Sequence, residues 1–397
     1  MTRRLLLSLA AWPLIGPPAS WAVAAPASAP PGPSRTSTST RTHWVFRTSQ
    51  GLEAIAFLGP LSGKPFYARH YARELSEFKP RLAATVLEAI DSLFAEADAA
   101  GTLLWPWVAL VASGGDTDTL EAVLRHLADD AAALEASFRT SPYAAGTPWE
   151  RFRRLVPRLR EVLAALAEAG FAEFHRRCFA DAAGRIEHLQ HRFASIDVVA
   201  ELERLVARRI EPRLELNLLW FCRPHGVKLQ GQRFIAQADA PDRVFVLTAA
   251  HEPLHPPFDM QGAVGRRCIE TLAADPLIRR ILAEKDRDSG YNSVEGLFEE
   301  GVVQALDQAV QERLGFARPG AARWRDSDGG IHVIAAALHG LLAADGFFRD
   351  GGDIEAWLGR AVASGRLAPA RLHEAAAAVR GQTVAELWTG PPAPASR

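Results

Sequence analysis

The stretch VFVLTAAHEPLH, residues 244–255, contains the pattern His-Glu-x-x-His, formed by His251, Glu252 and His255. Residues four apart on a helix share one face, so both imidazole rings can reach a single metal ion. Glu252 stands beside them and can hold and deprotonate a water molecule at that metal. The apolar run Val244–Leu247 before the motif predicts a short strand that leads directly into the metal-binding helix.

Prolines limit the length of this helix. Pro253 lies inside the motif, and Pro256 and Pro257 follow it directly. Proline lacks an amide hydrogen and disfavours a helical conformation in the residue before it. If the helix begins near Thr248, Pro253 falls just beyond the first turn, where it removes a hydrogen bond and produces a kink. We therefore expect a short, kinked helix that ends after His255, which still suffices to hold two ligands.

A catalytic zinc site needs a third protein ligand and an open position for water. A ligand placed six residues after His255, as in the metzincins, would have to be Gln261, and Phe258 stands where their glycine would be. A glutamate on a later helix is the other option. The segment Ser293–Leu306 is apolar-rich and helix-like, and it carries three acidic candidates, Glu295, Glu299 and Glu300.

The motif followed by a helix with a Glu-Gly pair resembles the gluzincin metallopeptidases, which include thermolysin-like enzymes and zinc aminopeptidases. In those aminopeptidases the ligand glutamate stands directly before a glycine. The resemblance therefore implies that Glu300, before Gly301, is the third zinc ligand, with Glu299 and Glu295 as alternatives. It also implies a zincin-like lobe, a bound Zn²⁺ and peptidase activity. The resemblance is closest to poorly characterised bacterial exported members.

A gluzincin also needs a hydrogen-bond donor that stabilises the oxyanion of the tetrahedral intermediate. Tyr291 is the first candidate, because it is close in sequence to the expected ligand helix. His332 and His339 are the alternatives, since they are seven residues apart and would share one helix face.

The spacing of apolar residues changes near the middle of the chain, from a helical repeat to short runs that are typical of strands. Apolar residues recur at helical spacing in four early segments, Tyr67–Phe78, Leu82–Ala97, Thr119–Leu134 and Trp149–Phe179. Short apolar or alternating runs predict strands at Trp44–Arg47, Leu214–Cys222, Val227–Leu229, Arg233–Gln237 and Val244–Leu247. Helical patterns return from Thr248 to the end. The expected fold is α+β and mostly helical, with a small mixed sheet in a zincin-like lobe.

These patterns predict five parts of the chain. Residues 1–24 form a signal peptide, with a basic start, an apolar run and the small-x-small sequence Ala22-Val23-Ala24. A flexible Pro/Ser/Thr linker follows over 25–42. A helical N-terminal lobe is expected over 43–205 and a metal-binding lobe over 206–388, before a disordered tail at 389–397.

The overall charge excludes several functions. The 397 residues carry 45 basic and 46 acidic side chains, so the formal charge is −1. Such a chain has no electrostatic footprint for nucleic acid or for an anionic membrane. The signal sequence is too short to span a bilayer comfortably, so no stable span is expected after cleavage. The three cysteines, Cys178, Cys222 and Cys268, are widely spaced and match no structural zinc site.

Taken together, the sequence favours a periplasmic or secreted zinc metallohydrolase, a peptidase whose partner is a peptide or protein substrate. His251, His255 and Glu300 would hold Zn²⁺. Glu252 would act as the general base and Tyr291 as the oxyanion donor. The alternative is a non-catalytic zinc-binding or assembly protein of the cell envelope on a zincin-like scaffold. The sequence leaves open the substrate, the choice between endo- and exo-cleavage, and the oligomeric state.

The signal peptide yields the first testable prediction. Mature protein recovered from the cell envelope or the medium should begin near Ala25, because the preceding Ala22-Val23-Ala24 has the small residues that a signal peptidase requires. N-terminal sequencing of the recovered protein measures this directly. A mature cytoplasmic protein that retains Met1 would contradict it.

Overall fold

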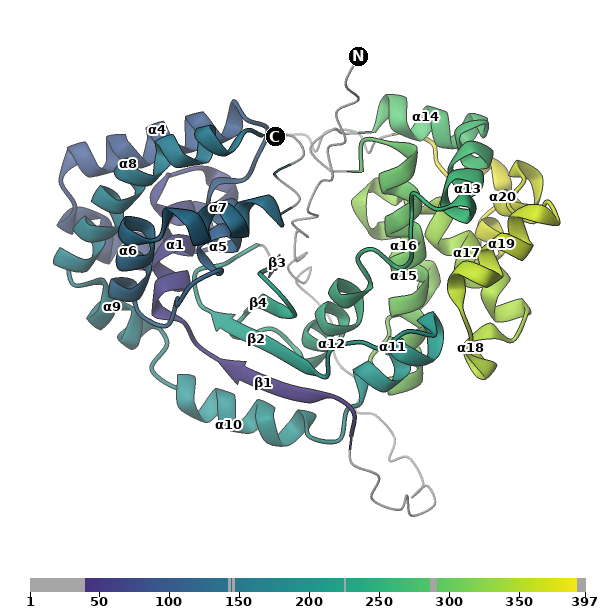
Figure 1. Cartoon of the computed structure of the whole chain (residues 1–397), viewed down its shortest axis with the longest axis horizontal. Helices are drawn as coiled ribbons and strands as arrows, with labels where there is room; N and C mark the ends of the chain where they lie inside the picture. The colour runs from purple at the N-terminus through teal and green to yellow at the C-terminus, as the bar shows by residue number, and fades with distance from the viewer. Residues whose placement is uncertain (1–39, 142–143, 145–146, 225, 286–290, 391–397) are drawn as a thin grey trace.

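A small sheet lies between two groups of helices (Figure 1). The computed structural model describes residues 40–390 except 142–143, 145–146, 225 and 286–290. The predicted signal peptide, most of the linker and nearly all of the tail lie outside these residues. Helices dominate the described chain and the sheet is small and mixed, so the predicted mostly helical α+β class is confirmed. None of the helices described is both long enough and apolar enough to cross a membrane.

The sheet has four strands in the order β1-β2-β4-β3. They span His43–Arg47 (β1), Arg213–Leu219 (β2), Val227–Lys228 (β3) and Arg233–Gln237 (β4). The first three in spatial order are parallel, and β3 runs antiparallel to β4 at the edge. These four strands match four of the five predicted runs, because each run is bounded by turn residues.

The fifth predicted strand is wrong. Residues 244–247 belong to helix α12, which spans Asp242–His251. The helix begins directly after Pro241, and Asp242 places an acidic side chain in its first turn, where the helix dipole favours it. Phe245 and Val246 are fully buried. A short apolar run fits a buried helix as well as a strand, and periodicity alone does not separate the two.

The first group of helices lies on one side of the sheet. It consists of α1 (Gln50–Leu61), α2 (Pro65–Ala68), α3 (Ala72–Phe78), α4 (Ala84–Asp98), α5 (Leu104–Ala112), α6 (Leu120–Asp129), α7 (Ala131–Arg139), α8 (Trp149–Glu168) and α9 (Phe171–Cys178). Helices α1 and α5 are buried on every side and form the centre of one hydrophobic core. They lack a polar face, so they show no amphipathic period in the sequence.

The remaining helices form a second hydrophobic core with the other face of the sheet. They are α10 (Ala182–Phe193), α11 (Val198–Val206), α12, α13 (Ala263–Ala273), α14 (Pro276–Glu284), α15 (Val294–Leu314), α16 (Gly320–Asp326), α17 (Val333–Ala344), α18 (Phe347–Asp350), α19 (Ile354–Ala363) and α20 (Pro369–Arg380). The described chain also contains short 3₁₀ turns, at Lys79–Arg81, Glu252–Leu254, Asp328–Gly330 and Val384–Glu386.

The two cores do not divide the chain at residue 205, where the sequence placed a boundary. Trp44 and Phe46 of β1 pack in the second core, and so do α10 and α11. Strand β1 has to join this core because it pairs with β2. The end of the predicted linker is also held in place. The backbone amide of Arg41 donates to Asp197 at 2.8 Å, and the buried Thr42 hydroxyl donates to the same carboxylate at 2.8 Å.

One buried carboxylate ties the first group of helices to the sheet. Glu53 of α1 is fully buried and accepts a hydrogen bond from the backbone amide of Phe221 at 3.0 Å and another from that of Trp220. Both residues directly follow β2. His175 of α9 lies 3.0 Å from the same carboxylate through Nε2. Glu53 therefore joins α1, α9 and the end of β2.

This junction yields a stability prediction. We expect Glu53→Ala to lower the free energy of unfolding by about 3–5 kcal/mol, because it leaves His175 and two amides buried without their acceptor. Part of the loss should depend on pH. Burial lowers the pKa of His175, but the charge of Glu53 and its hydrogen bond outweigh this effect and raise that pKa above its usual value.

The sign of the pH dependence follows from the raised pKa. The ion-pair contribution is fully present below the unfolded-state pKa of about 6.5 and disappears as pH rises through the higher folded-state pKa. Urea unfolding at about pH 6 and about pH 9 should show a smaller difference between wild type and Glu53→Ala at the higher pH. Glu121→Ala removes an exposed acid from the first turn of α6 and is the control. Equal stability of Glu53→Ala and wild type at the lower pH would contradict the assignment.

Candidate metal centre

The His-Glu-x-x-His motif spans the end of α12 and the turn that follows. The helix ends at His251, and Glu252–Leu254 form a 3₁₀ turn. Pro253 explains the change, because it lacks the amide that an α-helix would direct at the carbonyl four residues earlier. The amide of His255 instead donates to the Glu252 carbonyl at 3.3 Å. The helix starts earlier than the predicted Thr248, and the predicted break at the proline is present.

The third candidate ligand comes from α15, the long helix beside α12 (Figure 1). Ser293 caps the start of α15, where its side chain accepts a hydrogen bond from Gly296. Gly301, directly after Glu300, faces α17 so closely that a Cβ atom there would lie 2.7 Å from Ile334. The glycine of the Glu-Gly pair is therefore required by helix packing, and Glu300 projects from an adjacent position.

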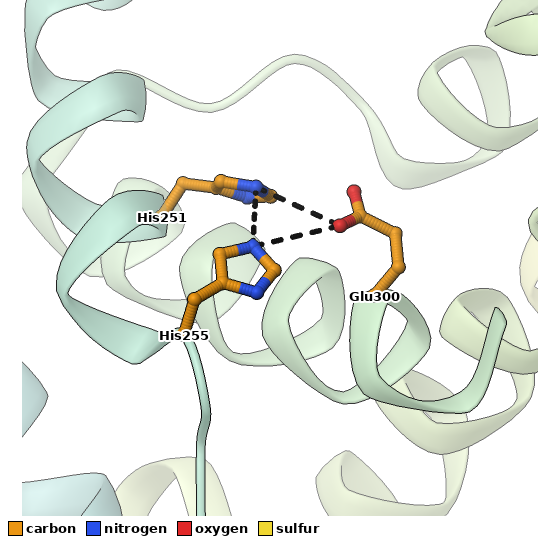
Figure 2. A group of neighbouring side chains, drawn as sticks. All are labelled: His251, His255 and Glu300. Atoms are coloured by element: carbon orange, nitrogen blue, oxygen red, sulfur yellow. Dashed lines mark hydrogen bonds and ion pairs between the residues drawn. The ribbon is translucent and has the colours of Figure 1, made fainter. Parts of the chain in front are cut away.

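Three donor atoms converge between α12 and α15 (Figure 2). The Nε2 atoms of His251 and His255 are 3.1 Å apart. One oxygen of Glu300, Oε2, lies 3.7 Å from Nε2 of His251 and 3.6 Å from Nε2 of His255. In the part of the chain that the structure describes, these three residues are the group of histidine, cysteine and acidic side chains able to hold a metal ion.

These separations suit a tetrahedral metal site. Donors at about 2.0–2.1 Å from one zinc ion would be about 3.3–3.4 Å apart at tetrahedral angles. The distance between the two Nε2 atoms, 3.1 Å, is slightly shorter than this value, and the two distances to Glu300, 3.6 and 3.7 Å, are slightly longer. Oε2 of Glu300 is buried and accepts no hydrogen bond from the residues described. A buried charged oxygen that accepts no hydrogen bond is costly, and a cation between it and the two imidazoles would remove that cost.

The other nitrogen of each histidine is held by a carboxylate from α15. Nδ1 of His251 lies 2.8 Å from Oδ2 of Asp307, and Nδ1 of His255 lies 3.1 Å from Oε1 of Glu299. An ionised carboxylate only accepts hydrogen bonds, so each Nδ1 carries the proton. When the ring is neutral, this tautomer leaves a lone pair on Nε2, on the side that faces Glu300, which is the arrangement that metal-binding histidines require.

Further contacts hold these carboxylates. Arg323 of α16 binds both oxygens of Asp307, with Nη2 3.0 Å from Oδ2, and both side chains are buried. Gln304 donates to Oε1 of Glu300 at 2.7 Å, and the Gln304 side-chain oxygen accepts from Trp324 at 2.9 Å. Rotation of Glu300 is therefore restricted, and its second oxygen stays directed toward the histidines.

The pKa values show that this site favours a cation. Burial lowers the pKa of His251, but the charge of Glu300 and the hydrogen bond with Asp307 outweigh it and raise the pKa to about 9. Burial raises the pKa of Glu300, yet the charges of His251, His255 and His332 hold it below its usual value. Buried carboxylates therefore favour positive charge here, which either a proton or a metal ion can provide.

Of the two proposed catalytic side chains, Tyr291 contacts one of the three donor residues. Burial raises the pKa of Tyr291 well above its usual value, and the charge of Glu300 and a hydrogen bond with it raise it further. The charge of Glu252 also raises the pKa of both His251 and Tyr291. Tyr291 therefore lies beside the candidate ligand Glu300, and Glu252 directly follows the candidate ligand His251 in the chain.

The alternatives from the sequence are placed differently. Glu299 faces Nδ1 of His255, on the side of the ring away from the other donors, and Glu295 pairs with Gln261. His332 precedes α17, is buried, and has its ring centroid 5.7 Å from that of Tyr291. Its Nε2 lies 2.6 Å from Asp328.

His339 lies further from the centre. It lies within 3.2 Å of Glu312, which is twelve residues beyond Glu300 on α15. Twelve residues of helix are about 18 Å long, so His339 is not beside the three donors. His332 and His339 also do not both belong to one helix face, because His332 lies before the first residue of α17.

Sequence reasoning missed the residues that support the ligands. Glu300, Gln304, Asp307 and Gln311 follow one another at intervals of four, three and four residues, and all are buried. These intervals place them on one face of α15. A polar face at helical spacing inside an apolar segment was the available signal. Arg323 gives no comparable signal, because it lies on another helix.

Comparison with known proteins does not identify a relative: no protein-family model, no curated protein and no solved structure matches the chain.

The centre yields a metal-binding prediction. The purified protein should bind about one zinc ion per chain, and His251→Ala should abolish binding, because it removes one of three protein ligands. Asp307→Asn should lower the zinc affinity about 10–100-fold, since it removes the carboxylate that orients His251. Zinc analysis and competition with a chelator measure both effects.

Glu295→Gln is the control for this experiment. It changes an acid on the same helix that pairs with Gln261 instead of facing the donors, so zinc affinity should be unchanged. Full zinc content in His251→Ala would place the site elsewhere.

Proposed function

We propose that this chain is a zinc-dependent metallohydrolase that cleaves peptide bonds, with a gluzincin-like centre formed by His251, His255 and Glu300. The observation that carries the proposal is the orientation of the two imidazoles. Each donates from Nδ1 to a carboxylate of α15 and presents Nε2 toward the buried Oε2 of Glu300. Three protein ligands leave a coordination position open, which is typical of catalytic and not of structural zinc sites.

Zinc bound here would polarise a substrate carbonyl and lower the pKa of a water molecule. Glu252 has the role of general base in this proposal. Its carboxylate would accept a proton from the attacking water and pass it to the leaving nitrogen. Its place directly after His251 in the His-Glu-x-x-His motif supports this assignment. The hydroxyl of Tyr291 would donate a hydrogen bond to the oxygen on which negative charge develops.

A buried neutral tyrosine suits this last role. Because its pKa is raised well above the usual value, the hydroxyl keeps its proton at neutral pH and remains a donor. His332 is the second candidate, because it is buried, its ring lies 5.7 Å from that of Tyr291, and Asp328 holds its Nε2 at 2.6 Å. The N-terminal sequence favours export, so the proposed place of action is the periplasm or the medium.

Glu252→Gln tests the proposed catalysis. It preserves the shape of the side chain and removes the base, so zinc content and fold should persist while hydrolysis falls by about two to four powers of ten. The assay is a screen of mixed peptides and casein at neutral pH with added zinc, followed by rate measurements on whichever substrate is cleaved.

Glu300→Gln is the comparison variant. It weakens a proposed ligand, so metal affinity and hydrolysis should fall together. If zinc-loaded wild type cleaves no substrate, or if Glu252→Gln is as fast as wild type, the protein is instead a zinc-binding or assembly protein.

A further inference from the structure

The carbonyl oxygen of Glu252 accepts two hydrogen bonds in the structure. One comes from the amide of His255 at 3.3 Å and closes the 3₁₀ turn. The other comes from the side chain of Lys228, whose Nζ lies 2.9 Å away. The two residues joined by the turn are the proposed base and the second proposed ligand. The Glu252 carbonyl therefore links both Glu252 and His255 to the ammonium group of Lys228 on the sheet.

The sheet directs Lys228 toward this turn. Lys228 is the last residue of β3 and pairs with Phe234, whereas Val227 pairs with Ile235. Neighbouring residues of a strand face opposite sides of the sheet. Phe234 packs in the core that contains α12 and α15, and Val227 and Ile235 pack in the other core. Lys228 therefore lies on the face that carries the metal centre.

Lys228 is half-buried, and taking an ammonium group partly out of water has a cost that requires an explanation. Among the residues described, no carboxylate lies within 4.0 Å of Lys228 to form an ion pair. Burial lowers the pKa of Lys228, and the charges of Glu252 and Glu299 oppose that change. The position is favourable for a cation for a second reason: α12 ends here, and the carbonyl end of a helix is its negative pole.

The turn also needs an external support. Pro253 removes the helical hydrogen bond that would otherwise fix this segment, and His255 has an extended backbone. The remaining hydrogen bond within the turn is long. A charged donor on the same carbonyl is shorter and stronger than a neutral one.

We propose that Lys228 is a positioning residue of the metal centre: its ammonium holds the Glu252 carbonyl and so fixes the placement of Glu252 and His255 relative to His251. This inference rests on the proposed metal centre and adds a sheet residue to it. Lys228 does not contact a proposed ligand atom, so it acts through the backbone of the turn.

Cobalt(II) binding tests this role without any substrate. Tetrahedral Co²⁺ absorbs visible light strongly, so a titration reports both affinity and ligand geometry. We expect Lys228→Met to lower Co²⁺ affinity about 10–100-fold and to change the visible spectrum, because His255 loses its fixed position. Lys228→Arg keeps the cation and should restore most of the affinity and the wild-type spectrum. Lys228→Gln keeps a donor without the charge and should fall between them.

Arg233→Met is the matched control. Arg233 is a half-buried cation on the adjacent strand β4, and it also donates to a backbone carbonyl, that of Gln230 at 2.9 Å. It faces the other side of the sheet from Lys228, where it also contacts the carbonyl of Ser113. Loss of this cation should leave the Co²⁺ affinity and spectrum unchanged. Thermal unfolding of each variant shows that the fold is intact.

The outcomes separate this inference from the proposed function. If wild type binds Co²⁺ and both Lys228→Met and Lys228→Gln bind it with the same affinity and spectrum, Lys228 is not a positioning residue and the metal centre stands. If Lys228→Arg binds as weakly as Lys228→Met, the effect is one of packing and the inference is also overturned. If wild type binds no Co²⁺, the metal centre itself is wrong, and Lys228 has no such role.

Discussion

Two carboxylates buried on one helix dominate this structure. Glu300 and Asp307 of α15 are 1% and 0% exposed. Ionised groups at such depth require positive charge or several donors close by. Arg323 compensates Asp307 through a two-pronged contact. Among the residues described, Glu300 forms ion pairs with the imidazoles of His251 and His255 and with no arginine or lysine. The helix therefore creates a place for a cation that the protein side chains fill only partly.

That requirement explains much of the arrangement around α15. Helix α12 has to end where His251 can reach Asp307 with one nitrogen and Glu300 with the other. Helix α17 approaches α15 at Gly301, next to the candidate ligand Glu300, where a larger residue would force the helices apart. Gln304 and Trp324 form a chain that holds the second oxygen of Glu300. Each contact limits the rotation of a donor, and a preorganised donor set binds metal more tightly than a mobile one.

The sequence predicted the parts of the fold that depend on local pattern. Strands bounded by turn residues, such as β4 at Arg233–Gln237, agree with the structure. Helix α5 was missed because it is apolar on every side, and α12 was mistaken for a strand because its start is a short apolar run. At the candidate metal centre, the motif spacing pointed to His251 and His255, and the resemblance to gluzincins pointed to Glu300 with Glu299 and Glu295 as alternatives; the structure brings the first three together. The roles of Asp307 and Lys228 depend on contacts between distant segments, which spacing along one segment does not reveal.

Pro253 interrupts the helix that carries the His-Glu-x-x-His motif, and contacts from other elements hold the end of the motif in place. A continuous helix would hold His255 by its own hydrogen bonds, and the proline removes that possibility. Instead, Glu299 of α15 holds the ring of His255, and Lys228 of the sheet holds the carbonyl of Glu252. Both supports come from other elements. The position of His255 therefore depends on the packing of α15 and the sheet against α12, so the candidate metal centre is a product of the tertiary fold and not of the motif alone.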